Sequence, residues 1–225
     1  MVFREINVSD RLVLAQEEVG GSEPHIWLTA PNPVASESRE QWWLYKPVKT
    51  GARPVAGGGG GTYSRHDDEA ERVACALARL IGLPAAEVEI AVRNEDRGVI
   101  SRNVTPDGWA LFGGDLILSV VEGYVSCQGE NRPRNRLGHN LTNVSQVLAG
   151  HPGPAEYGSW QAFEVFAGYL VFDAWIANTD RHAMNWAVLE RGGERILAPS
   201  FDHGSALASG SSDDDLSRKD PMTFS

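Results

Sequence analysis

The feature that most constrains the fold of this chain is a long apolar run over residues 161–178, QAFEVFAGYLVFDAWIAN. Its aromatic and aliphatic side chains recur at helical spacing and cover much of the helix circumference. A helix that is apolar on most sides has to lie against other elements, because water would otherwise contact its side chains. We therefore expect a buried helix over these residues, followed by a polar loop.

The polar loop and the hairpin after it carry the residues best suited to chemistry. Asp180 lies in the loop, Asn185 follows five residues later, and Asp202 comes after a predicted hairpin over residues 186–197. Phosphoryl transfer from ATP needs a carboxylate near the attacking hydroxyl and magnesium to neutralise phosphate charge. Carboxylate and amide oxygens are the ligands that magnesium prefers. Protein kinases place these residue types in the same order.

Each of these residues also has a structural interpretation when it is considered alone. Asp and Thr after a helix are common turn and capping residues, so Thr179 and Asp180 fit a simple helix end. A lone histidine such as His182 is more often a structural hydrogen-bonding group than a catalytic base. The order of base, amide and carboxylate across a helix and a hairpin favours the catalytic interpretation.

The first half of the chain is rich in short strand patterns around a single helix. The strands are predicted at residues 2–8, 11–15, 25–29, 41–45, 88–92 and 98–100, and the helix begins at Asp67 and ends before Gly82-Leu83-Pro84. Residues 50–63 contain five consecutive glycines, which predicts a mobile loop. This loop lacks the Gly-Lys-Ser/Thr ending of a P-loop. Residues 108–120 fit no single pattern.

Three places in this half could contact a nucleotide. Gly20, Gly21 and Ser22 lie between two strands, where glycine lets backbone N–H groups approach phosphate oxygens. Lys46 ends the strand at residues 41–45, and Glu71 on the helix could pair with it. Each also has a simpler interpretation, namely an ordinary turn, an exposed lysine and a solvated helix residue.

Charge and apolar content exclude several classes of function. The net charge of −10 repels a phosphate backbone, and we read the basic cluster at residues 132–136 as a solvated loop, so we expect no direct nucleic-acid binding. The acidic residues 213–215 are expected in a solvated, mobile tail. Cys75 and Cys127 form no metal or disulfide pattern. With no membrane-spanning run and no signal peptide, we expect a cytoplasmic protein.

Taken together, these segments resemble the HipA-like kinases, which are bacterial toxin kinases of HipA–HipB toxin–antitoxin systems and their stand-alone relatives. The resemblance extends over roughly residues 17–206, and its most specific part runs from Asn178 to Gly204. The matching segments are residues 43–47, 68–83, 98–102, 174–186 and 197–202.

The resemblance implies a role for each candidate residue. It makes Asp180 the catalytic base, and Asn185 and Asp202 the magnesium ligands. Binding of ATP is implied for a larger set: Lys46 with its partner Glu71 at the phosphates, Gly20, Gly21 and Ser22 in a phosphate-covering loop, Ser101, Arg102 and Asn103 at a hinge beside adenine, and His182 in the same site.

The implied fold is α+β and two-lobed, like a protein kinase, with a β-rich N-lobe over residues 1–104 and a mainly helical C-lobe over residues 105–225. The chain has 225 residues, so 23 follow Asp202, and we expect a shortened C-lobe because the family normally continues further. The implied activity is ATP- and Mg²⁺-dependent phosphorylation of Ser or Thr in a protein, including the kinase itself.

Two alternatives remain beside this activity. The chain could be a nucleotide-binding pseudokinase or interaction module, or it could phosphorylate a small molecule or a lipid. The expected partners are a protein substrate, whose identity the sequence does not indicate, and an antitoxin if the chain acts as HipA does with HipB.

Overall fold

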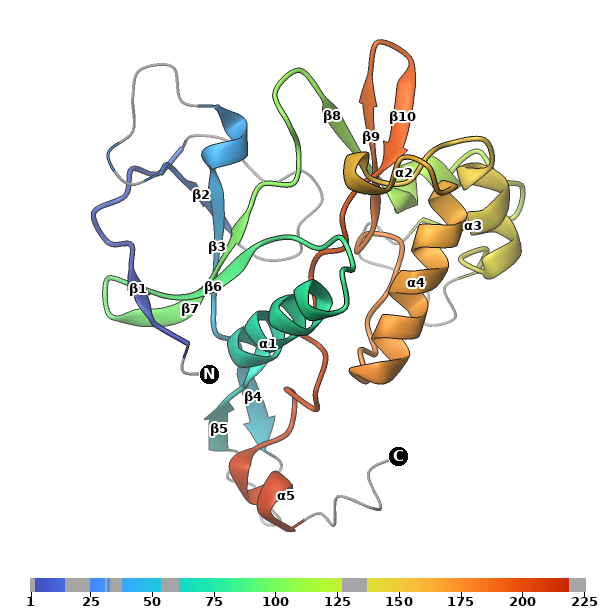
Figure 1. The fold of residues 1–225 in the computed structure, drawn as a ribbon. Helices are drawn as coiled ribbons and strands as arrows, with labels where there is room; N and C mark the ends of the chain where they lie inside the picture. Colours follow the sequence, from blue (N-terminus) through green and yellow to red (C-terminus); the bar gives the residue numbers. More distant parts are fainter. Residues whose placement is uncertain are drawn as a thin grey trace.

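The computed structural model describes residues 3–14, 25–30, 32, 38–53, 61–126 and 137–218, which form a mixed α+β fold (Figure 1). A five-stranded sheet has the order β1-β6-β7-β3-β2. Its strands are β1 (Ile6–Asn7), β6 (Val88–Arg93), β7 (Asp96–Arg102), β3 (Trp43–Pro47) and β2 (Ile26–Leu28). Helix α1 (Asp67–Leu80) packs on β6 and β7, and a short 3₁₀ turn, η1 (Arg39–Gln41), precedes β3.

Alternation along β7 explains why both faces of this sheet are covered. Val99 points toward α1 and packs with Cys75 and Val88, whereas Ile100 belongs to a second cluster on the opposite face. The hairpin between β6 and β7 closes with Asn94 and Glu95, whose φ angles are 50° and 73°. Two central residues at positive φ are typical of the tight turn that matches the twist of paired strands.

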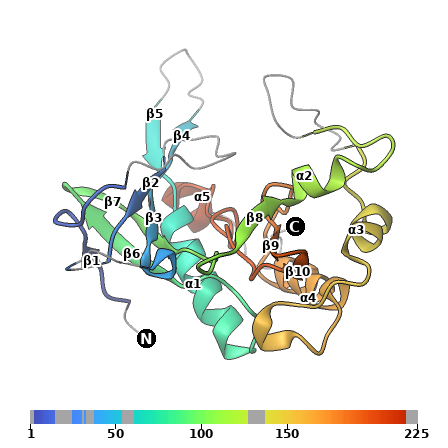
Figure 2. The same ribbon diagram turned by 90° about the horizontal axis from the view of Figure 1, so that it is seen from above.

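Most of the described chain between residues 105 and 200 forms a second sheet with helices beside it (Figures 1 and 2). The strands have the order β10-β9-β8 and are β8 (Ala110–Gly113), β9 (Ala187–Arg191) and β10 (Glu194–Leu197). The helices are α2 (Gly114–Leu118), α3 (Leu141–Leu148), the 3₁₀ turn η2 (Ala155–Tyr157) and α4 (Ala162–Trp175). Phe166, Tyr169 and Trp186 are almost fully buried in the core that joins α4 to this sheet. Their burial is the main source of stability for this half.

Helix α4 confirms the predicted helix but only part of the predicted burial. It begins with a capping box between Gln161 and Glu164 and ends at Trp175, so residues 176–178 belong to the next loop. Val171 and Trp175 are 72% and 59% exposed. The expectation of burial on most sides is therefore wrong for this face, because apolar composition alone does not show which side of a helix meets the core.

Two predicted mobile segments contain regular structure instead. Within residues 50–63, β4 (Thr50–Arg53) pairs antiparallel with β5 (Gly61–Ser64), although most of the glycine run lies outside the described residues. The acidic residues 213–215 form the first turn of α5 (Asp213–Arg218). Carboxylates are favourable at a helix N-terminus, and the Ser212 hydroxyl accepts a hydrogen bond from the Asp215 N–H at 3.2 Å.

Three other sequence expectations have different outcomes. Residues 11–15 were expected to form a strand, but the described part contributes a single bridge, from Val13 to Leu28. The ambiguous segment at residues 108–120 contains both β8 and α2. The hairpin predicted around Gly192 and Gly193 is confirmed, as β9 and β10.

The five-stranded and three-stranded sheets come from different parts of the sequence, on either side of residue 104, and the two-stranded sheet of β4 and β5 belongs to the first part. Helix α5 nevertheless lies next to β4 and β5, which precede residue 104 in the sequence (Figure 1). The boundary at residue 104 stays a prediction. No helix in the described part of the chain is long and apolar enough to cross a membrane.

Gly98 in β7 offers a test of how tightly β3 is held. A Cβ at this position would overlap the Lys46 carbonyl oxygen and lie 2.9 Å from the Cα of Pro47. We expect Gly98→Ala to lower the free energy of unfolding by about 1–3 kcal/mol, because the strands would have to separate. Gly158→Ala is the matched control, since its Cβ would lie 3.6 Å from the Ala155 oxygen. Urea unfolding of both variants checks the difference, and equal stabilities would contradict it.

Candidate active site

Three charged residues from distant parts of the sequence meet between the two sheets. Lys46 near the end of β3 places its Nζ 3.3 Å from Oε1 of Glu71, which lies on the second turn of α1. The same ammonium lies 3.0 Å from Oδ1 of Asp202, five residues after the end of β10. The structure thus brings Lys46 and Glu71 together, as the sequence suggested, and adds Asp202 to the pair.

The two carboxylates around Lys46 differ in their environments. Burial raises the pKa of Glu71, the Lys46 ammonium opposes that shift, and the charge of Asp202 adds to it. Burial also acts to raise the pKa of Asp202, but the charges and hydrogen bond of Lys46, together with Lys49, bring its pKa below the usual value. The Asp202 side chain is still 42% exposed, so this ionised carboxylate can also meet a ligand from solvent.

The backbone at Asp202 is in an uncommon conformation. Its φ is 61°, in the left-handed region that a residue with a Cβ rarely adopts. Such conformations persist only where surrounding contacts impose them, and they concentrate at functional sites. The contact with Lys46 and the bonds to the preceding residues described below are those contacts.

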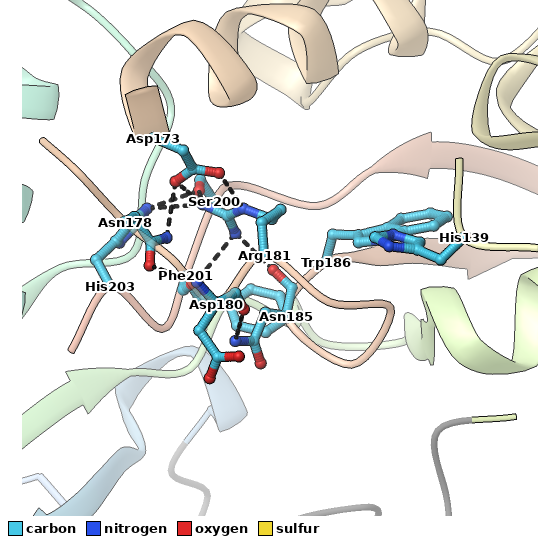
Figure 3. A network of polar contacts seen from close by, with 10 residues as sticks. All are labelled: His139, Asp173, Asn178, Asp180, Arg181, Asn185, Trp186, Ser200, Phe201 and His203. Atoms are coloured by element: carbon cyan, nitrogen blue, oxygen red, sulfur yellow. Dashed lines mark hydrogen bonds and ion pairs between the residues drawn. The ribbon is translucent and has the colours of Figure 1, made fainter. Parts of the chain in front are cut away.

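The loop after α4 holds Asp180 and Asn185 in a tight turn. The His182 N–H donates to the Asp180 carbonyl at 2.8 Å, and the Asn185 N–H donates to the His182 carbonyl at 2.9 Å. The side-chain Nδ2 of Asn185 also donates to the Asp180 carbonyl, at 2.7 Å. The Asp180 carboxylate and the side-chain oxygen of Asn185 then point to the same side of the loop (Figure 3). A proton acceptor and a metal ligand can act side by side in this arrangement.

A buried arginine fixes this loop to α4. Arg181 is 8% exposed, and its Nε and Nη2 donate to the two carboxylate oxygens of Asp173 at 2.7 and 2.8 Å. Asp173 also accepts from the Nδ2 of Asn178 at 2.8 Å. The third nitrogen of the guanidinium, Nη1 of Arg181, donates to the Asn185 carbonyl at 2.6 Å. One bidentate ion pair therefore sets both ends of the turn that carries Asp180.

The same arginine reaches the chain that leads into Asp202. It donates to the Phe201 carbonyl at 3.2 Å and to the Ser200 hydroxyl at 2.9 Å (Figure 3). Nε2 of His203 lies 3.1 Å from Arg181 and 2.9 Å from Ser200. Burial and the Arg181 charge lower the pKa of His203 to about 3, so its ring is neutral and its Nε2 accepts these bonds.

Arg181 and Asp173 are residues that reasoning from the sequence missed. A sequence signal did exist, because Asp173 is a lone charge near the end of an apolar helix, and such a charge needs a partner. His182 is placed differently from the arginine beside it. Its Nδ1 accepts from the Met184 N–H at 3.2 Å, and its Nε2 lies 3.8 Å from Oδ2 of Asp180. Its contact with a nucleotide stays a prediction.

The predicted hinge residues lie where β7 ends and the chain leaves the five-stranded sheet. Ser101 is buried in β7, and the Arg102 side chain donates to the Glu40 carbonyl at 2.7 Å. The Asn103 side chain donates to the Arg39 carbonyl at 3.0 Å. These contacts brace η1, and binding of adenine here stays a prediction. Gly20, Gly21 and Ser22 lie outside the described residues.

Asn185 and Asp202 carry oxygen atoms of the kind that magnesium prefers, and their binding of the ion stays a prediction. They offer an amide oxygen and an ionised, part-exposed carboxylate, and Arg181 contacts the Asn185 carbonyl as well as the Phe201 carbonyl just before Asp202. The described residues contain no group of three or more His, Cys, Asp or Glu side chains that could hold a metal alone. Magnesium does not need one, because it commonly uses one or two protein ligands with waters and phosphates.

No family model and no curated protein matches this chain in sequence. Its structure is similar to that of the proinflammatory kinase CtkA of Helicobacter pylori, with a TM-score of 0.66 and 18% identity over 96% of this chain and 65% of that one. A looser likeness, with a TM-score of 0.47 and 15% identity, covers 70% of this chain and 44% of a chain in the Shewanella oneidensis complex of HipA, HipB and operator DNA.

At these identities the likeness shows the fold. The chain has a kinase-like α+β fold, as the resemblance to HipA-like kinases implied. The similarity to CtkA extends over nearly the whole of this chain. This chain spans about two thirds of the length of the CtkA chain.

The ion pair between Arg181 and Asp173 generates a prediction about stability. Asp173→Ala leaves a buried guanidinium without its carboxylate, so we expect the free energy of unfolding to fall by about 3–5 kcal/mol. Asp180→Asn is the matched control, because the Asp180 side chain is 40% exposed and the substitution keeps its size. Chemical denaturation measures both variants, and a loss below about 1 kcal/mol for Asp173→Ala would contradict the assigned role.

His203 generates a prediction about pH. Its pKa is about 3 in the folded protein and 6.5 normally, so the unfolded chain binds the extra proton as pH falls through 6.5. Its contribution is therefore present above pH 6.5 and is lost toward acid, by about 2 kcal/mol at pH 5. His203→Gln keeps an acceptor and removes the titration. Urea unfolding at pH 8 and pH 5 should show a smaller acid loss in this variant, and equal losses would exclude the mechanism.

Proposed function

We propose that this chain is an ATP- and Mg²⁺-dependent kinase of the HipA-like type that phosphorylates Ser or Thr in a protein, itself included. The observation that carries the proposal is the convergence of Lys46, Glu71 and Asp202 beside a rigid loop bearing Asp180 and Asn185. The kinase-like fold shared with CtkA supports it.

The charges of the site give each residue a task. When ATP binds, the Lys46 ammonium exchanges its contact with Asp202 for a contact with the ATP phosphates. It keeps its ion pair with the buried Glu71. Asp202 is then released toward solvent, where it and Asn185 would hold Mg²⁺. The ion would supply neutralisation of the charge on the transferred phosphate.

Asp180 acts on the acceptor side. Its carboxylate is part-exposed, and the turn that contains it is fixed at both ends by Arg181, so it can orient a substrate hydroxyl and accept its proton. Ser101, Arg102 and Asn103 would lie beside adenine, His182 would lie near the phosphates, and Gly20, Gly21 and Ser22 would cover them.

One observation favours a second candidate, a nucleotide-binding pseudokinase. The ion pair of 3.0 Å between Lys46 and Asp202 engages both the proposed phosphate contact and a proposed metal ligand. If ATP binding does not break this pair, the chain binds nucleotide without transferring phosphate. A cognate antitoxin and the absence of direct nucleic-acid binding remain predictions, the second resting on the net charge of −10.

Phosphate transfer to the chain or to a generic Ser/Thr protein substrate should be measured with labelled ATP and Mg²⁺. We expect Asp180→Asn to reduce transfer by about a hundredfold or more and to leave ATP affinity unchanged. Lys46→Met should weaken ATP binding itself. Glu194→Gln, on the exposed end of β10, is the matched control and should behave as the unmodified chain does.

Calorimetry with ATP and Mg²⁺ separates the two candidates. Nucleotide binding without transfer would support the pseudokinase. A chain that binds no ATP would exclude both.

A further inference from the structure

The residues that follow Asp202 cross from the second sheet back to the first turn of α1. We call residues 204–213 the return segment; it passes α1 and leads into α5, beside β4 and β5 (Figure 1). It has contacts with α1 at three successive points, and none of them involves the residues assigned above to phosphate, metal or proton transfer, except Glu71.

The first contact is with Glu71 itself. A Cβ added at Gly204 would lie 3.6 Å from Oε2 of Glu71 and 3.4 Å from the Cβ of Asp67. The backbone of the return segment at Gly204 therefore lies beside the carboxyl group that contacts Lys46. A shift of this backbone would open the packing behind the Lys46–Glu71 pair.

The second contact pins α1 to the region of α4. Ala206 is fully buried and packs with Ala74 and Ala78 on α1 and with Phe172 and Ile176 at the end of α4. The next residue in the return segment donates its N–H to the Ile176 carbonyl at 2.9 Å. Removing the segment from this position would expose apolar surface on both helices.

The third contact holds the N-terminal turn of α1. His66 is the N-cap of α1, and its side chain makes no capping hydrogen bond. Its backbone N–H donates instead to the Ser209 carbonyl at 3.0 Å, and its Nε2 lies 3.0 Å from Oδ1 of Asp213. Nearby, the Tyr63 hydroxyl donates to the Gly210 carbonyl at 2.5 Å. The return segment thus holds the residue at which α1 begins, through both its backbone N–H and its ring.

These anchors hold the segment in a shape that its own residues disfavour. Leu207 and Ala208 have φ angles of 52° and 57°, and two successive residues with a Cβ rarely adopt this region together. Strain of this kind favours release once an anchor is broken, because the free backbone would relax to common angles.

We propose that the return segment positions α1, and through Glu71 keeps Lys46 in the nucleotide site, so that the anchor between His66 and Asp213 controls ATP affinity. The positioning of α1 stands on the contacts above, and its effect on ATP rests on the proposed function. Asp213 is 88% exposed at its side chain, so this anchor is accessible and weak enough to be broken without unfolding the core.

A charge exchange tests the proposal on the whole chain. His66→Glu places a carboxylate against Asp213 and Glu69, which lies 3.5 Å from the His66 ring. We expect faster hydrogen exchange at the amides of residue 66 and Ala70, which donate to the Ser209 and residue 66 carbonyls, and an ATP affinity about two- to fivefold weaker. Asp213→Lys added to His66→Glu should restore both properties, because the opposite charges then face each other again.

Arg195→Glu is the matched control. It reverses a comparable exposed pair, with Glu190 at 2.6 Å on the hairpin of β9 and β10, and it should change neither measurement. Unchanged exchange in α1 for His66→Glu, or no recovery in the double variant, would overturn the positioning role. Tighter ATP binding by His66→Glu would overturn its direction. If the unmodified chain binds no ATP, the proposed function fails, while the exchange measurement still decides whether the segment holds α1.

Discussion

The candidate site depends first on the buried ion pair between Arg181 and Asp173. Asp173 lies on α4, whose aromatic residues form the core of the second half, so the position of the carboxylate is fixed by that core. Arg181 carries this position outward to the Asn185 carbonyl and to Phe201. A bidentate guanidinium–carboxylate pair has a defined plane. It therefore fixes the orientation of the loop that carries Asn185 and of the segment that leads into Asp202.

Around Lys46 the arrangement is a balance between two carboxylates of different character. Glu71 is buried away from solvent, whereas Asp202 remains part-exposed and ionised. The Lys46 ammonium lies between them, and Lys49 also helps to keep Asp202 ionised. Because burial raises the pKa of Glu71, the part-exposed Asp202 is the ionised carboxylate that a ligand can reach.

Local patterns predicted much of the fold. Apolar spacing indicated α1 and α4, and turn residues indicated the hairpin of β9 and β10. The exposed face of α4 and helix α5 were not predicted, because the first depends on which neighbours cover the helix and the second on a cap from Ser212.

The site was predicted as a set of residue types in order, and the structure adds which of them meet. Lys46 and Asp202 are separated by 156 positions, and nothing local in sequence shows that they share a hydrogen bond. The role of Arg181 was missed for the same reason, since it follows from a partner on the preceding helix rather than from the loop pattern. Spacing in sequence indicates chemistry, whereas contact depends on the packing of whole elements.

The return segment has a consequence for the order in which the chain folds. His66 and Asp213 are 147 positions apart, so the start of α1 gains this anchor only after residue 213 has joined the chain. Contacts of such long separation slow folding, because a large loop must close before they form. During synthesis, the residues of the five-stranded sheet therefore precede the segment that anchors the start of α1.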